Sequence, residues 1–217
     1  MKKQYFNLII ILLLVAFVAA CSKDSEDVSR ETAYPVLKIK GDQFMTIAKG
    51  STFTDPGIDA TIGGSPVQYQ TEGTVNAATP GVYKLTYSAV NSDGYSAVVK
   101  RWVGVYESDI IGKDYSGVWK RTTGVITNWT KDVSNQGLYV TDNVGGVNLA
   151  TSPAFGFDIR IFNIKDSTLV IPLQPATIGG ELTCTNINLK PSVGNGQVSW
   201  VVIHPNYGTA ARTFNRQ

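Results

Sequence analysis

Residues 82–89 read Val-Tyr-Lys-Leu-Thr-Tyr-Ser-Ala and give the clearest strand pattern in this chain. From the tyrosine onward, every second side chain is aromatic or aliphatic, and the side chains between them are polar. Successive side chains of a strand point to opposite faces, so this alternation predicts a strand with one buried face. Asp93-Gly94 follows and predicts a hairpin turn, because glycine readily adopts positive φ. We expect a long strand after this turn, from Tyr95 to Tyr106.

The region before the hairpin is divided by turn signals. Asp55-Pro56-Gly57 predicts a turn because proline presets φ and glycine accepts positive φ. About six or seven short strands over residues 34–106, with no long amphipathic helical pattern, favour a small β-sandwich. Arg101 interrupts the apolar row of the last strand, and a bulge at residues 100–102 would explain the interruption.

The order of these landmarks resembles the bacterial Ig-like domain that is common in surface proteins. The matching stretches are residues 50–57, 73–76, 79–83, 87–94 and 101–105. The resemblance covers residues 34–106 and implies a β-sandwich that serves as a spacer or an adhesion module. The loop at residues 61–66 lacks the aspartates that often follow in relatives, so we predict no calcium site there.

A second β domain is predicted over residues 114–217, after a short linker at residues 107–113. Its strand candidates alternate with turns rich in glycine and asparagine at a spacing typical of antiparallel sheets. We therefore predict an all-β protein in which the Ig-like β-sandwich precedes a second antiparallel β domain, either a small barrel or a sandwich. Gly117-Val118-Trp119 resembles the start of lipocalin-like barrels.

The N-terminus predicts a lipoprotein signal peptide over residues 1–20. Lys2 and Lys3 precede an uninterrupted apolar run over residues 8–20, which is shorter than the roughly 20 residues of a membrane-spanning helix. Small residues then stand before Cys21, as in the bacterial lipoprotein signal that this stretch resembles. The resemblance implies that Cys21 is acylated and becomes the first residue of the mature chain. An ordinary secretory signal with a chance cysteine is the alternative.

Residues 21–33 are predicted to be the acylated cysteine and a polar, acidic tether. The stretch after Cys21 reads Ser-Lys-Asp-Ser-Glu-Asp and resembles the export tag of surface lipoproteins in the Bacteroides group. A plain solvated spacer between lipid and fold is the alternative. The whole plan resembles Bacteroides-group lipoproteins that accompany SusC/SusD-like nutrient importers. This resemblance implies an outer-membrane, lipid-anchored protein at the cell surface, with an importer complex as a candidate partner.

Composition excludes several classes of function. The 19 basic residues include Lys2 and Lys3, so the mature chain would carry 17 basic and 17 acidic residues, without a basic cluster for nucleic acid. The chain has one histidine, His204, and its second cysteine, Cys184, lies in an alternating strand pattern. We therefore predict no catalytic residues, no metal site, no cofactor and no disulfide. A glycosidase built on two carboxylates of the second domain is a distant third hypothesis.

Binding is the function that the second domain favours. Sugars stack on exposed aromatic rings, while asparagine and aspartate bond their hydroxyl groups. Trp119 and Trp200 lie in apolar rows and are interpreted as core residues. The predicted ligand-binding residues are Trp129, Tyr207, Asn128 and Asp132, because polar neighbours surround Trp129 and Tyr207 follows a Pro-Asn turn. The first hypothesis is a non-enzymatic lipoprotein that binds a glycan or an importer partner. The alternative is a structural or adhesive scaffold that contacts only other proteins.

Overall fold

A computed structural model describes residues 31–192 and 194–217. The predicted signal peptide, Cys21 and most of the tether lie outside these residues. Residues 34–217 form one compact unit. Within the described residues, no helix has the length and apolarity required to cross a membrane.

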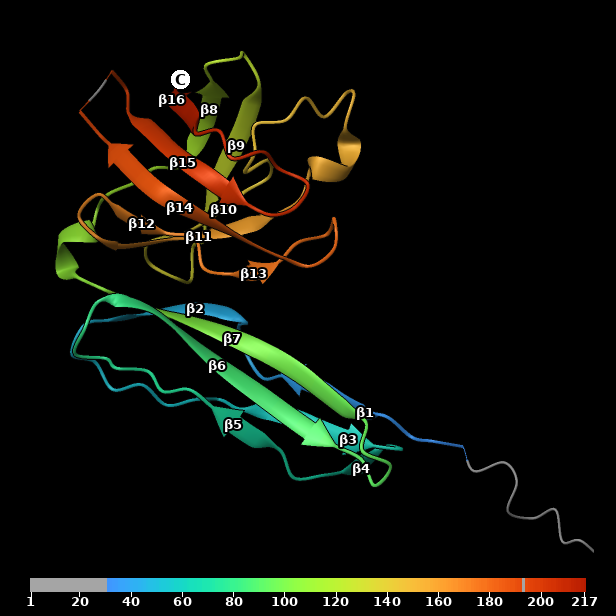
Figure 1. Cartoon of the computed structure of the whole chain (residues 1–217). Coiled ribbons are helices and arrows are strands. Elements are labelled where there is room, and N and C mark those ends of the chain that lie inside the picture. Colours follow the sequence, from blue (N-terminus) through green and yellow to red (C-terminus); the bar gives the residue numbers. More distant parts are fainter. Residues whose placement is uncertain (1–30, 193) are drawn as a thin grey trace, which may run out of the picture. The chain divides into compact units, whose positions relative to one another are not determined.

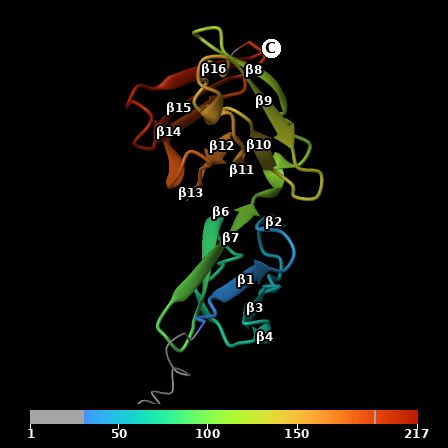
Figure 2. The same cartoon turned by 90° about the vertical axis from the view of Figure 1, so that its right-hand side faces the viewer.

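Two sheets make up the N-terminal β region, and Figures 1 and 2 show them facing each other. The first sheet has the order β1-β3-β4, with β1 (Pro35–Ile39), β3 (Ile58–Ile62) and β4 (Ser65–Pro66). The second has the order β2-β7-β6-β5, with β2 (Phe44–Ala48), β7 (Ser96–Tyr106), β6 (Gly81–Val90) and β5 (Gln70–Glu72). The β2–β7 pair is parallel, and the other pairs are antiparallel.

The β6–β7 hairpin is the longest pairing in this region and confirms the predicted strands and their turn. Its register runs without a break from Gly81 opposite Val105 to Val90 opposite Ser96. In the predicted inner row of β6, Leu85, Tyr87 and Ala89 are buried, whereas Tyr83 is half-buried. Leu85 and Tyr87 pack with residues of the facing sheet in one apolar core. At the entry to β6, the Tyr83 hydroxyl donates to the Thr79 carbonyl at 2.8 Å.

Arg101 is not accommodated by a bulge, so that part of the prediction is wrong. Its side chain points into the core and is fully buried. The guanidinium pairs with the Asp55 carboxylate at 3.1 Å and donates to the carbonyls of Lys40 and Gly57. The Tyr87 hydroxyl also donates to Asp55, at 2.8 Å. The Asp-Pro-Gly turn therefore carries the counter-charge of a buried arginine.

The C-terminal β region is one nine-stranded sheet that curls on itself (Figure 1). Each strand pairs with its neighbour in sequence except at one junction, and the last strand pairs with the first. Its strands are β8 (Gly117–Arg121), β9 (Ile126–Lys131), β10 (Leu138–Thr141), β11 (Ile159–Lys165), β12 (Thr168–Val170), β13 (Gln174–Pro175), β14 (Glu181–Lys190), β15 (Gln197–Ile203) and β16 (Arg212–Arg216).

The curl follows from the connection between β12 and β13. These strands form the two ends of the hydrogen-bonded order, yet only residues 171–173 separate them in sequence. Side chains close the junction: the Gln174 amide bonds both the backbone N–H and the carbonyl of Arg160, and Thr183 Oγ1 donates to the Ile171 carbonyl. The all-β class is confirmed, and the curled sheet agrees with the predicted barrel rather than a second sandwich.

The segment between the two regions is packed rather than extended. Ser108–Ile110 form a short 3-10 helix, and Ile110 is buried. Trp102 on β7 shares an apolar cluster with Leu138 and Phe162 of the second region. Within the described residues, no sheet combines strands from both sides of residues 107–113. The division into two domains stays a prediction, because residues 34–217 form one compact unit.

Replacing Asp55 with asparagine should lower the free energy of unfolding by about 2–3 kcal/mol, because it leaves the buried Arg101 cation without its counter-charge. Urea unfolding followed by circular dichroism measures the change. Asp59→Asn is the matched control, because it removes the exposed Lys40–Asp59 pair. An Asp55→Asn protein as stable as the control would contradict the structural role assigned to Asp55.

Candidate functional site

The expected exposure of Trp129 is wrong. The side chain lies inside the curled sheet with 2% of its surface exposed, and its ring stacks on Trp119 and Trp200. Ring centroids are 4.7 Å and 5.7 Å from it, respectively. The polar neighbours that suggested a surface position, Asn128 and Thr130, point to the opposite face of β9. Both tryptophans predicted as core residues are buried, as expected.

Tyr207 is also buried, with 9% of its surface exposed. The Arg212 guanidinium lies 5.1 Å from the centre of its ring, and Phe155 packs edge-on against it. Gly145 allows this packing, because a Cβ there would lie 2.2 Å from the tyrosine ring. Burial raises the pKa of Tyr207 to about 12. Neither aromatic candidate presents a ring face on which a sugar could stack.

The two polar candidates form bonds within the protein. The Asn128 backbone N–H and side-chain amide both donate to the Asp142 carboxylate, at 2.8 and 2.7 Å. The Asp132 carboxylate accepts the backbone N–H groups of Ser134 and Asn135, which fixes the turn before β10. The four predicted residues therefore do not converge on one site.

His204 and Cys184 have structural surroundings. The His204 ring bonds the Gly179 carbonyl and accepts the backbone N–H of Asn206, so it fixes a turn. Cys184 is buried as predicted, and this burial raises the pKa of its thiol. A thiol that stays protonated is a poor nucleophile. Among the described residues, no group of three or more histidine, cysteine or acidic side chains could hold a metal ion.

A hollow of about 390 Å³ lies at one rim of the curled sheet. It is built from the segment before β8, the β11–β12 turn, the β14–β15 turn and the end of β16. Its lining residues are Lys113, Asp114, Tyr115, Asp166, Pro191, Asn195, Gly196 and Arg216. Sequence reasoning missed this site because its parts lie about a hundred positions apart and share no motif.

Arg216 fixes the geometry of this rim hollow. Its guanidinium donates to the carbonyls of Asp114 and Ser116, which holds the start of β8 against the last strand. Beneath the rim, Trp119 Nε1 donates to the Tyr115 carbonyl at 2.9 Å. The wall of the hollow is therefore bonded to the packed interior, and its polar groups are held in place before a ligand arrives.

The charges in the rim hollow are largely compensated. Lys113 and Asp166 form an ion pair, and their hydrogen bond raises the pKa of the lysine and lowers the pKa of the carboxyl. Burial is the largest single effect on Asp114 and opposes its ionisation, but hydrogen bonds from Ser116 together with the charges of Lys131 and Arg216 lower the pKa of that carboxyl. Both carboxyls are thus ionised acceptors at neutral pH. The Asn195 side chain has no hydrogen bond to any other described residue, which leaves its donors and acceptor free.

Comparison with known families identifies part of the chain. Residues 37–105 match the family described as bacterial surface protein, Ig-like domain. This confirms that the chain carries such a domain. No curated protein sequence matches the chain.

Three of the solved structures to which the chain is similar come from Bacteroides thetaiotaomicron and Clostridium perfringens. A lipoprotein from Bacteroides thetaiotaomicron has a TM-score of 0.39 and 23% identity, with 85% of this chain and 100% of that chain covered. The M60 catalytic domain with CBM51-1 and CBM51-2 domains of Clostridium perfringens ZmpB has a TM-score of 0.30 and 14% identity, covering 78% of this chain and 14% of that one. A structure of CBM51-2 in complex with GlcNAc and INT domains, from the same protein, has a TM-score of 0.29 and 15% identity. The match covers 77% of this chain and 29% of that one.

Trp129→Ala should destabilise the protein by about 3–5 kcal/mol, because it opens a cavity between two stacked indole rings. Trp129→Phe should cost less, since a ring remains in the stack. Chemical unfolding together with the near-ultraviolet circular dichroism of the indoles checks both changes. Full stability of Trp129→Ala would mean that this side chain is not part of the core.

Proposed function

We propose that this protein is a non-enzymatic lipoprotein, anchored through Cys21 to the outer membrane and exposed at the cell surface, whose C-terminal β region binds a glycan. The N-terminal sequence supports the anchor and its location, and the Ig-like domain supports a surface role. The importer partner predicted from sequence fits the same location. A scaffold that contacts only other proteins stays the alternative.

The observation that carries glycan binding is the rim hollow. Sugar hydroxyl groups both donate and accept hydrogen bonds, and the hollow offers both kinds of group within one concave surface. Asp114 and Asp166 are ionised acceptors, and the amide of Asn195 can donate as well as accept. Lys113 is paired with Asp166, and the guanidinium of Arg216 is bonded to two backbone carbonyls, so a neutral sugar would not leave either cation without a partner.

Asn195→Ala should weaken glycan binding about tenfold, because it removes the free amide without disturbing a bond that holds the fold. Isothermal titration of the full-length protein with a panel of neutral and acidic polysaccharides measures the affinity. Asn188→Ala is the matched control, since Asn188 is an exposed asparagine on β14 that does not line the hollow. Equal affinities of the two variants would exclude the rim hollow, and no binding across the panel would favour the scaffold.

Cys21→Ser should abolish lipid attachment, because the hydroxyl does not replace the thiol in the acylation reaction. Incorporation of labelled palmitate and the distribution between membrane and soluble fractions report the result. Cys184→Ala keeps Cys21 and should retain the label. If Cys21→Ser still incorporates palmitate and pellets with membranes, the chain is anchored by other means.

A further inference from the structure

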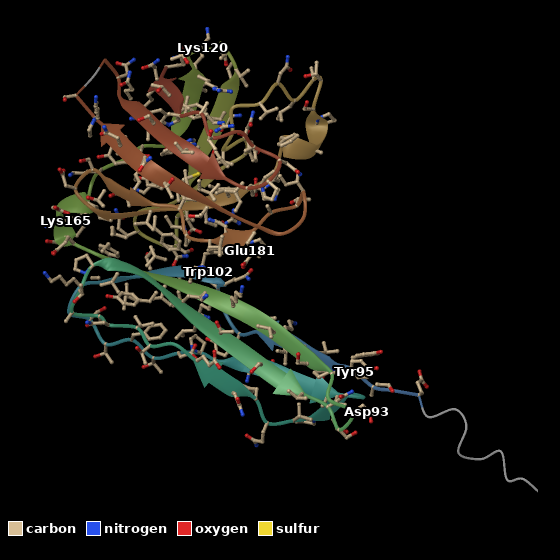
Figure 3. All side chains as sticks on the ribbon, viewed as in Figure 1. Asp93, Tyr95, Trp102, Lys120, Lys165 and Glu181 are labelled. Atoms are coloured by element: carbon tan, nitrogen blue, oxygen red, sulfur yellow. The ribbon has the colours of Figure 1, made fainter. Side chains whose placement is uncertain are left out.

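The exposed aromatic side chains lie in the Ig-like region, where sequence reasoning did not look for a site. Among the described residues, the large hydrophobic side chains that are exposed include three aromatic ones, Tyr34, Tyr69 and Tyr95, and all three precede the linker. Tyr34 and Tyr95 pack against each other with ring centroids 5.1 Å apart. Figure 3 labels Tyr95 close to Asp93, at the tip of the β6–β7 hairpin.

The outer face of β5, β6 and β7 is uncharged toward this tip. Gln70 on β5 is opposite Ser88 on β6, and Ser88 is opposite Val98 on β7. The next pair toward the tip is Val90 with Ser96. Val90 and Val98 are 58% and 52% exposed, so this face presents two aliphatic side chains to solvent. Three neighbouring strands therefore present apolar groups beside uncharged polar groups.

A hollow of about 270 Å³ opens on the β5 side of this face. Its lining residues are Gln68, Tyr69, Gln70, Ser88, Ala89 and Val90, and none of them carries a charge. The amides of Gln68 and Gln70 have no hydrogen-bond partner in the described part of the chain, so they are available to a ligand.

Tyr69 packs against the core at the wall of this hollow. Its ring packs edge-on against the buried Tyr87, with centroids 6.2 Å apart. Gly57 makes room for its hydroxyl, because a Cβ at that position would lie 2.7 Å from the oxygen. A ring fixed by the core loses little conformational entropy when a ligand contacts it.

A second hollow, of about 340 Å³, lies on the β7 side of the same face. Val98 and Trp102 line it together with Pro175 and Glu181, and Figure 3 labels Trp102 and Glu181 next to each other. Glu181 pairs with Lys100 at 2.7 Å, so the charges in this hollow compensate each other. Ser88, which lines the first hollow, is directly opposite Val98, which lines the second. Since neighbouring strands are only about 4.8 Å apart, the two hollows are connected.

We propose that the outer face of β5, β6 and β7 is a groove that binds a neutral polysaccharide chain. Apolar sugar faces would lie on Val90 and Val98, while hydroxyl groups bond the free amides of Gln68 and Gln70. The linings of the two hollows carry no unpaired charge, which favours a neutral ligand over an acidic one, and two connected hollows favour a chain over a single sugar. This groove lies on the Ig-like region and is independent of the rim hollow in the proposed function.

Gln70→Ala in the full-length protein tests the groove, with laminarin, xylan and mannan as neutral probes and polygalacturonate as an acidic one. The variant should bind one neutral probe about fivefold more weakly than the unchanged protein, because it loses a side-chain hydrogen bond. Thr71→Ala is the matched control, since Thr71 is exposed on the same strand but points to the other face. Equal unfolding midpoints establish that both variants fold.

Oligosaccharide length gives a second measurement. A hexasaccharide of the bound probe should bind at least about tenfold more tightly than the disaccharide, because only the longer chain reaches both hollows. Val98→Asp should remove most of this gain, since it places a charge between the hollows.

Three outcomes would overturn the groove. The first is that Gln70→Ala binds every neutral probe as tightly as the unchanged protein does. The second is that the unchanged protein prefers polygalacturonate to the neutral probes. The third is that it binds phospholipid vesicles and no polysaccharide. Loss of binding in Asn195→Ala together with full binding in Gln70→Ala would support the rim hollow and reject the groove, so the two proposals fail separately.

Discussion

The buried guanidinium of Arg101 is the interaction on which the Ig-like region depends. A cation inside an apolar core is tolerated only when hydrogen bonds and a counter-charge satisfy it. Asp55 supplies the counter-charge, and the carbonyls of Lys40 and Gly57 accept further hydrogen bonds, from two segments that precede β3. One side chain of β7 thereby fixes the Asp-Pro-Gly turn and the end of β1 against the second sheet. The alternation of β7 then turns Val98, Lys100 and Trp102 away from this core: Val98 is exposed, whereas Trp102 is buried against the C-terminal β region.

Closure of the C-terminal sheet imposes a second constraint, because a curled sheet has an interior that must be filled. Trp119, Trp129 and Trp200 stack through it, and the indole N–H groups of Trp119 and Trp200 donate to backbone carbonyls. Trp129 and Tyr207, the aromatic residues predicted to bind a ligand, are therefore buried by packing. Within this region, the rim hollow that we propose for recognition is instead built from turns that come from distant parts of the chain.

The sequence predicted features that depend on local alternation and turn chemistry. The β6 strand, its Asp-Gly turn, and the core positions of Trp119 and Trp200 all follow from patterns within about ten residues. Trp129 and Arg101 were misjudged for one shared reason. Arg101 is a charged residue on the buried face of its strand, and Trp129 is a buried residue whose neighbours in sequence are polar. In both cases the residues that pack against the side chain are far away in sequence. The rim hollow was missed for the same reason. Lys113 and Arg216 line one hollow only because β8 and β16, the first and last strands of the C-terminal region, pair with each other.

The difference in charge between the two surfaces bears on how one chain could discriminate among glycans. At the rim hollow, Lys113, Asp166, Asp114 and Arg216 supply strong hydrogen bonds, and an ill-fitting ligand would desolvate them without replacing their partners. Such a site selects by the geometry of hydroxyl groups. The hollow beside β5 offers an aliphatic side chain and glutamine amides, which would tolerate many hydroxyl arrangements and reject mainly charge. If both proposed surfaces bind glycan, a tolerant one and a selective one on the same chain would act in series, since the first raises the local concentration of polysaccharide that the second discriminates.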